Sequence, residues 1–305
     1  ITFTFGSIIH ITIEKMFQAT GNMLIPMILQ IIGAVVNIIL DPILIFGING
    51  FLELGVAGAA IATIIGQMSA CLLAIFLFRK KSALKISFKN FKPEFQTIKA
   101  IYSIAVPSGV MTAMPSILVA LLNSLLATVS QTAIAFFGVY FKLQSFVYMP
   151  ANGLIQGMRP LISYNYGAQY FERVKKIIKV SIVVVSVILC SGAFIFVLFP
   201  KLILSWFNAT DSLIRIGVIG LRIFSLGFII STFGIVISGV FESLGIGKYS
   251  LTISLLRQLV ITLPLAYILL SLIGLNGVWL SFVISEFIAS VTAIVLLKKQ
   301  LAKFK

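Results

Sequence analysis

The sequence predicts an all-α, polytopic membrane protein, and three observations support this fold class. The chain of 305 residues is 60% hydrophobic and only 10% charged, far from the composition of water-soluble globular domains. Its apolar runs reach about 20 residues, the length that a helix needs to cross a bilayer core of ~30 Å. These runs are also continuously apolar, whereas the strands of a membrane barrel alternate over about ten residues.

Nine segments are long and apolar enough to be transmembrane helices. Short stretches with glycine, proline or charged residues separate them. An odd number of spans leaves the two ends of the chain on opposite sides of the membrane. The expected spans are residues 1–19, 23–46, 54–78, 100–126, 132–158, 177–199, 213–241, 249–272 and 275–297.

The net charge of +15 is concentrated in alternate connections. Arg and Lys gather within residues 79–99, 173–179 and 298–305 and at Lys248, whereas the intervening connections contain only Lys201. By the positive-inside rule the basic connections are cytoplasmic, which predicts a multi-pass protein of the cell membrane with a cytoplasmic C-terminus. A nucleic-acid-binding protein would instead collect its basic residues on one soluble face, so we expect no nucleic-acid partner.

The longest and most polar connection divides the chain into two lobes. Residues 1–78 form a partial N-terminal lobe of three transmembrane helices. Residues 79–98 form a basic cytoplasmic linker between the lobes, and residues 99–305 form a C-terminal lobe of six transmembrane helices.

The first three spans are repeated by the last three. FQATGN at 17–22 and FESLGIG at 241–247 each lead into a long span that contains a proline, Pro42 or Pro264, and the leading phenylalanines are offset by 224 residues. Both copies have the same orientation by loop charge, so the repeat is parallel. Six spans in each copy would give a two-lobed bundle of twelve helices, and we therefore expect that this chain, which begins without methionine, is truncated at its N-terminus.

The segment NIILDPILIFG, residues 37–47, places Asp41 within an otherwise apolar span. An ionised acid at the bilayer centre costs roughly 2.5–3.5 kcal/mol, so such acids usually face a bundle interior and serve a function. Gln30, Asn37 and Asp41 are spaced to lie on one helix face. We interpret them as a site that binds the coupling cation. Alternatively, Asp41 caps a helix that resumes after a break at Pro42.

Two further acids flank the repeated turns. Glu14 and Glu242 fall at the cytoplasmic ends of their helices. A simple interpretation places each of them at the level of the lipid headgroups, near Lys15 or Lys248.

Glu286 lies inside the last span, where a charge needs a partner. We expect a structural ion pair with Arg257 or Arg222 on a neighbouring helix. The possible structural or gating residues are therefore Glu14, Glu242, Arg257 and Glu286.

Two stripes of polar residues follow the linker, and the first begins with Ser108 and Thr112. Small polar residues on membrane helices often bind a neighbouring helix, which is one interpretation. The other is a cavity for organic cations, since aromatic faces attract cations and uncharged amides give adaptable hydrogen bonds. The substrate-cavity candidates are Ser116, Asn123, Tyr140, Gln144, Tyr148, Asn152 and Gln156.

Four motifs occur in a fixed order: FQATGNMLIPM, NIILDPILIFG, LGVAGAAIATIIGQ and GLIQGMRPLISYNYGAQ. Together they resemble the multidrug and toxin extrusion (MATE) family of efflux transporters, and the resemblance covers essentially the whole chain. It aligns the nine spans with the fourth to twelfth helices of that family. It implies two six-helix bundles around a central cavity, which alternate between outward and inward faces and are driven by a proton or sodium gradient.

The resemblance also bears on the site residues. One branch of the family places a cation-binding acid at the position of Asp41, with a partner acid on the first helix, which this chain lacks. A second branch carries acids on the seventh and tenth helices. The sequence has no acid from Lys99 to Arg159 or within 213–241, so the second arrangement is not supported.

The function implied is secondary active antiport, in which organic and often cationic xenobiotics leave the cell in exchange for protons or sodium. We expect a monomer in the lipid bilayer without cofactors. An enzyme is disfavoured, because His10 is the only histidine and no GxxxxGK[ST] loop occurs. The alternative is a flippase for lipid-linked saccharides of the same superfamily, whose cavity would offer Arg and Lys to phosphates; Arg159, Arg222, Arg257 and Lys142 leave this open.

Overall fold

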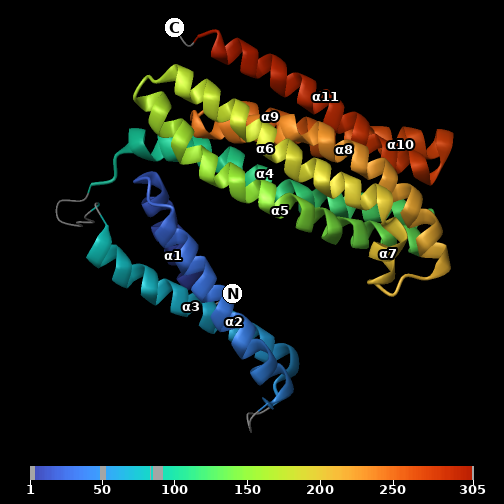
Figure 1. Cartoon of the computed structure of the whole chain (residues 1–305), viewed down its shortest axis with the longest axis horizontal. Coiled ribbons are helices and arrows are strands. Elements are labelled where there is room, and N and C mark those ends of the chain that lie inside the picture. Colours follow the sequence, from blue (N-terminus) through green and yellow to red (C-terminus); the bar gives the residue numbers. More distant parts are fainter. Residues whose placement is uncertain (1–3, 49–52, 83, 85–91, 304–305) are drawn as a thin grey trace. The chain divides into compact units, whose positions relative to one another are not determined.

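The computed structural model describes residues 4–48, 53–82, 84 and 92–303, and these residues are mainly helical (Figure 1). The chain divides into two compact units, Ile1–Lys92 and Pro93–Lys305. The boundary falls within the basic segment 79–98. Helices take both ends of that segment, so the connection between them is shorter than the sequence suggested, and residues 83 and 85–91 of it lie outside the described part of the chain.

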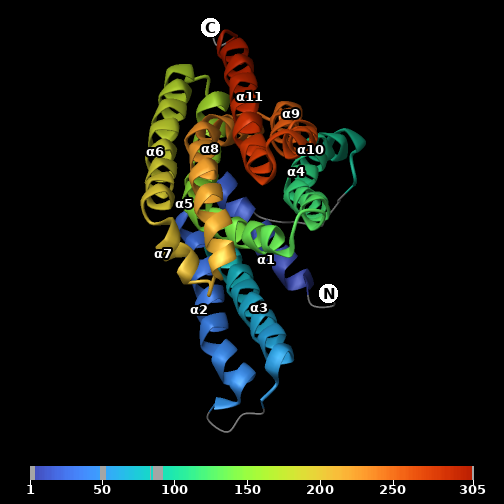
Figure 2. The ribbon, with the colours of Figure 1, turned by 90° about the vertical axis from the view of Figure 1, so that its right-hand side faces the viewer.

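The first unit is a helical hairpin with one additional helix. Its second and third helices run antiparallel, side by side (Figure 2). Its small core joins Phe17, Leu29 and Ala74, all almost fully buried, and the ring of Phe17 meets that of Phe78 edge-on at 5.8 Å. The helices of this unit are α1 (Thr4–Ala19), α2 (Leu24–Phe46) and α3 (Gly55–Lys81).

The second unit is a larger bundle around α8. Most helices of the unit pack on α8, which is also its most buried long helix. A single π-helical segment, Leu256–Val260, interrupts the helix that precedes the last one. The helices are α4 (Phe95–Ala127), α5 (Gln131–Gly167), α6 (Phe171–Leu198), α7 (Pro200–Ser205), α8 (Asp211–Ser243), α9 (Gly247–Leu255), α10 (Thr262–Ile273) and α11 (Leu275–Leu301).

Aromatic rings fill the core of the second unit. Trp279 of α11 and Phe136 of α5 are fully buried and meet edge-on, with ring centroids 5.2 Å apart. Phe224 of α8 lies 5.3 Å from the same indole ring. The ring of Phe136 fits against Gly217 and Gly220, where any side chain would collide with it. Because glycine has no side chain, these two positions of α8 leave room for the aromatic layer.

The repeat seen in the sequence recurs in the geometry of its two turns. In each turn an N–H group donates to the carbonyl of the leading phenylalanine five residues earlier, from Asn22 at 2.9 Å and from Ile246 at 2.8 Å. The preceding residue is a glycine with left-handed φ, 82° at Gly21 and 73° at Gly245. This is the Schellman arrangement that ends a helix, and glycine adopts it without strain.

The repeated hairpins also close in the same way. Gly58 of α3 packs directly on the backbone carbonyl of Leu44 in α2, and Gly277 of α11 packs on the carbonyl of Leu269 in α10. A Cβ atom at either position would overlap that oxygen. The LGVAG and LNGVW motifs are thus explained by close contact between helices.

Among the residues that the structure describes, seven helical segments are long and apolar enough to cross a membrane, by length and composition. The α9–α10 pair counts among them as one interrupted segment. Two expected spans fall outside this set: α1 has only 16 residues, and α5 carries several polar residues. A multi-pass helical protein is therefore confirmed, while the count of nine spans is not.

We predict that Gly277→Ala destabilises the protein, because the new methyl group must displace the backbone of α10. Overpacking of this kind costs about 1–3 kcal/mol. Gly138→Ala is the matched control, since its site on α5 is open and alanine favours a helix. Thermal unfolding in detergent, followed by size-exclusion chromatography, measures both variants. Equal stability of the two would show that the α10–α11 contact is looser than described.

Candidate functional site

Asp41 lies in the body of α2. The helix runs unbroken from Leu24 to Phe46 with Pro42 inside it, so the alternative that Asp41 caps a resumed helix is wrong. Pro42 has no N–H group to offer the carbonyl of Ile38, which weakens the helix locally. The amide of Asn37 donates to the half-buried carboxylate at 3.3 Å, and Thr63 of α3 lies beside the same amide. The carboxylate therefore has neutral neighbours.

Gln30 does not join this group. It lies eleven residues before Asp41, which is about 16 Å along a helix. Its amide instead donates to Glu14 of α1 at 3.0 Å. The other carboxylate oxygen of Glu14 lies 3.1 Å from Nε2 of His10. Glu14 and Asp41 thus belong to separate polar groups of the first unit, and the predicted three-residue site is divided between them.

Glu14 is buried, so its expected position among the lipid headgroups is wrong. Its exposed fraction is 3%, and that of His10 is 8%. His10, Glu14 and Phe17 are spaced by four and three residues, which places them on one face of α1. That face packs on α2 and α3 and contains the core residue Phe17, which explains why the acid is shielded.

A polar cleft lies inside the second unit. It consists of two adjoining cavities of about 480 and 450 Å³. They share four lining residues, Pro115, Tyr148, Asn152 and Arg257. The walls come from α4, α5, α8, α9, the π-helical segment and α11. A cleft of this size, with mixed polar and apolar walls, can hold a small organic molecule.

Four of the seven cavity candidates line this cleft: Gln144, Tyr148, Asn152 and Gln156. Ser108 and Thr112, which begin the first polar stripe, line it as well.

The other three candidates lie elsewhere. Ser116 and Asn123 are not among the residues that line either cavity. Tyr140 is a core residue, only 2% exposed, and stacks on Phe224 with ring centroids 3.5 Å apart. A spacing of four residues advances 40° beyond a full helical turn, so over the sixteen residues from Tyr140 to Gln156 the stripe rotates by about 160°. Tyr140 therefore points away from the cleft.

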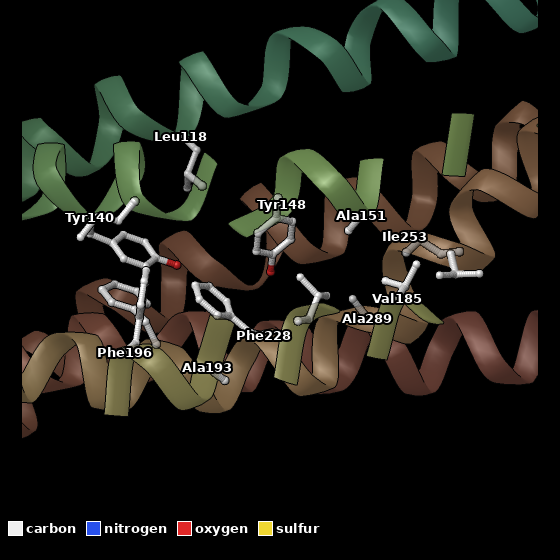
Figure 3. Close-up of a cluster of buried hydrophobic side chains, with 14 of the residues drawn as sticks. Leu118, Tyr140, Tyr148, Ala151, Val185, Ala193, Phe196, Phe228, Ile253 and Ala289 are labelled. Atoms are coloured by element: carbon white, nitrogen blue, oxygen red, sulfur yellow. The ribbon is translucent and has the colours of Figure 1, made fainter. Parts of the chain in front are cut away.

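Tyr148 connects the cleft to the core. Its hydroxyl group and that of Ser231 on α8 are hydrogen bonded at 2.7 Å. Its ring meets Phe228 edge-on, with centroids 5.4 Å apart (Figure 3). This fixed ring gives both cavities a rigid aromatic wall.

Two ion pairs lie on the walls of the cleft. Nε of Arg257 lies 3.2 Å from Oε1 of Glu286, so one of the two expected partners of Glu286 is the correct one. Nη2 of Arg159 lies 3.0 Å from Oε2 of Glu242. Glu242 thus binds α8 to α5, and its partner is Arg159 and not the expected Lys248. The sequence could not reveal this pair, because its members are 83 residues apart.

The π-helical segment explains the position of Arg257. The N–H of Ile261 donates to the carbonyl of Leu256 at 3.3 Å, five residues back, and Pro264 cannot donate to the turn before it. The hydroxyl of Thr262 donates to the carbonyl of Arg257 at 2.6 Å. Wider turns of this kind occur often at functional sites, because they redirect a side chain.

Apolar helices of membrane-spanning length, a repeated hairpin and a polar cleft define a multi-pass membrane protein of the transporter class. A family model described as MatE matches residues 107–268, more than half of the chain. The chain belongs to this family, the MATE transporters.

The relatives and structural neighbours agree with this family. Multidrug export protein MepA of Staphylococcus haemolyticus is 31% identical over 287 residues, which are 94% of this chain and 62% of the relative. MepA of Staphylococcus aureus is 30% identical over 292 residues, 95% of this chain and 63% of the relative. The chain thus spans less than two thirds of the length of these curated relatives.

Solved structures show the same fold. A MATE protein in a bent conformation has a TM-score of 0.88 at 23% identity, and the match covers 99% of this chain and 67% of that protein. A mutant of the Vibrio cholerae MATE transporter VcmN has a TM-score of 0.87 at 22% identity, and the match covers 96% of this chain and 66% of that transporter. At these identities the likeness concerns the fold alone.

We predict that the cleft is open to water-soluble reagents. In a background with Cys71 and Cys190 replaced by alanine, Asn152→Cys should react with a charged thiol reagent. Ala151→Cys is the matched control, since the neighbouring Ala151 is fully buried and should stay protected. Mass spectrometry after timed labelling measures both. Equal labelling would contradict the described orientation of α5.

Proposed function

We propose that this chain forms most of a secondary multidrug efflux antiporter, which exports organic and often cationic compounds in exchange for protons or sodium. The observation that carries the proposal is a polar, aromatic-walled cleft within a unit of a MATE fold. The relatives named as multidrug export proteins support the same activity.

Coupling to the ion gradient is assigned to Asp41, with Asn37 as its positioning residue. The carboxylate lies within a membrane-spanning helix and accepts a hydrogen bond from a neutral amide. Its charge is therefore not compensated by the neighbours described, and a bound cation would stabilise it. Gln30, which binds Glu14, acts on a different acid.

Substrate binding is assigned to the cleft of the second unit. Gln144, Asn152 and Gln156 offer uncharged donors and acceptors, and Tyr148 offers a fixed ring. Such walls accept varied organic cations, because cation–π attraction and amide hydrogen bonds tolerate changes in ligand shape.

We propose that the complete protein is a monomer in the cell membrane with its C-terminus in the cytoplasm. In the second unit the basic residues near the start of α6 and the end of α11 lie at the same end of the bundle (Figure 1). The positive-inside rule assigns that end to the cytoplasm.

The cleft favours drug export over the flipping of lipid-linked saccharides. Diphosphate binding needs arginine or lysine groups with free donors and excess positive charge. The two arginines on the cleft walls, Arg159 and Arg257, are each paired with a glutamate. Their charges are thus neutralised within the cleft.

We predict that Asp41→Asn abolishes gradient-driven efflux in the complete protein, because the neutral amide cannot exchange a cation. Ethidium extrusion from loaded cells measures this effect. Asp211→Asn is the matched control, since Asp211 is an exposed residue in the first turn of α8, and it should retain transport. Unchanged efflux in Asp41→Asn would remove Asp41 from the mechanism.

We predict that the coupling ion is the proton. Ethidium extrusion in proteoliposomes should collapse when a protonophore is added and should persist in sodium-free buffer. Extrusion that requires sodium and resists the protonophore would assign the gradient to sodium instead.

A further inference from the structure

The ion pair between Arg257 and Glu286 is part of the wall of a cavity. The side chains are 20% and 13% exposed, and both line the cavity of about 450 Å³. Taking two charges out of water costs as much as their attraction often returns, so a shielded ion pair is weak evidence for a purely structural role. This pair faces a space that a ligand can enter.

Only one of the two carboxylate oxygens of Glu286 contacts the arginine. Oε1 lies 3.2 Å from the single atom Nε of Arg257. Oε2 is buried and has no hydrogen-bond partner within the described part of the chain. Arginine and carboxylate groups often form two parallel hydrogen bonds, and this pair does not. The neighbouring position on α8 is Gly234, which has no side chain to approach the free oxygen.

The cavity around this carboxylate suits an organic cation. Phe141 and Phe282 provide aromatic faces, and Met149 provides a soft apolar surface. Gln144 and Gln258 add uncharged amides. A flat cation with hydrophobic rings would gain from each of these groups, and Glu286 is the only acid among the residues that line this cavity.

The guanidinium group of Arg257 has a second position within the cleft. It lines both cavities, and the first of them also contains Glu242. The arginine extends from the π-helical segment, whose backbone is already wider than an α-helix. Its guanidinium group can therefore turn from the second cavity toward the first without leaving the cleft.

We propose that Arg257 acts as a tethered competitor of the substrate, so that an organic cation entering the second cavity displaces its guanidinium group from Glu286 and pairs with that carboxylate. In the empty cleft the arginine neutralises Glu286, and in the loaded cleft the substrate does so. The proposal rests on the proposed transport of organic cations and adds the acid that binds them.

The test is equilibrium binding of ethidium to the purified chain in nanodiscs at pH 8, followed by fluorescence anisotropy. Arg257→Gln should lower the Kd for ethidium about tenfold or more, which corresponds to about 1.4 kcal/mol, because the competitor is removed and the acid remains. Glu286→Gln should raise the Kd by a similar factor. The double variant Arg257→Gln/Glu286→Gln should resemble Glu286→Gln.

Tighter binding after loss of a partly buried arginine is the distinguishing result. A merely structural pair predicts the opposite, since loss of either member would loosen the cleft and weaken binding in both single variants. Weaker or unchanged ethidium affinity in a monodisperse Arg257→Gln protein would overturn the proposal. If Arg257→Gln does not fold, Arg257→Met, which replaces the charge with a chain of similar length, is measured in its place. Unchanged ethidium affinity in Glu286→Gln alone would also overturn the proposal.

Two controls complete the experiment. Glu172→Gln/Lys175→Gln removes the exposed ion pair on α6, outside the cleft, and should leave ethidium binding unchanged. An uncharged dye such as Nile red should bind wild type and Arg257→Gln equally. Binding needs no gradient, so the two proposals can fail separately. If the binding test fails while the complete protein still exports ethidium, this inference alone is rejected. If the expected binding pattern is found but the complete protein does not export, the proposed antiport is rejected.

Discussion

The whole arrangement depends on the cost of a carboxylate within an apolar helical bundle. In a low-dielectric region each acid needs a partner, because water cannot solvate it. Four of the described acids, Glu14, Asp41, Glu242 and Glu286, lie in helices and are at least partly buried, and each has a polar group within 3.3 Å. Three of these contacts join different helices, so the acids also fix which helix faces meet. In this protein polar pairing and helix packing are one constraint.

The irregular turns of two helices also bear on the position of these acids. Pro42 and Pro264 are repeat-related, yet α2 continues through the first proline while the helix before α11 widens into a π-helical segment ahead of the second. The difference lies in what the neighbouring residues can do. The hydroxyl of Thr262 donates to the carbonyl of Arg257, and its oxygen lies 2.8 Å from that of Ser285, which stabilises the wider turn. The wider turn in turn positions Arg257 opposite Glu286.

Much of the fold follows from local sequence. Hydropathy and glycine placement predicted the helices and the repeated turns, because both depend on a few neighbouring residues. That Glu286 pairs with an arginine was also predictable, since a shielded acid needs a base, but the sequence left both Arg257 and Arg222 open and the structure selects Arg257. By contrast, the pair of Glu242 with Arg159 joins residues distant in sequence, and no local pattern marks it.

Two site predictions were wrong for reasons of helix geometry. A stripe of residues four apart does not stay on one helix face, because the period of 3.6 carries Tyr140 into the aromatic core. Glu14 was assigned to the headgroups from its place near a helix end. Its spacing from the core residue Phe17 was the available signal, since two residues three apart share a face.

The partners of the acids differ between the two units, and this difference suggests a division of labour. In the first unit Asp41 faces an amide, and Glu14 faces an amide and an imidazole, which are groups that carry no permanent charge. In the second unit both acids that line the cleft face arginine, which stays protonated. An acid with neutral partners gains charge balance by taking an ion from solution, whereas an acid paired with arginine is already balanced until another cation displaces the guanidinium group. The first arrangement suits coupling to a gradient, and the second suits selection of a substrate.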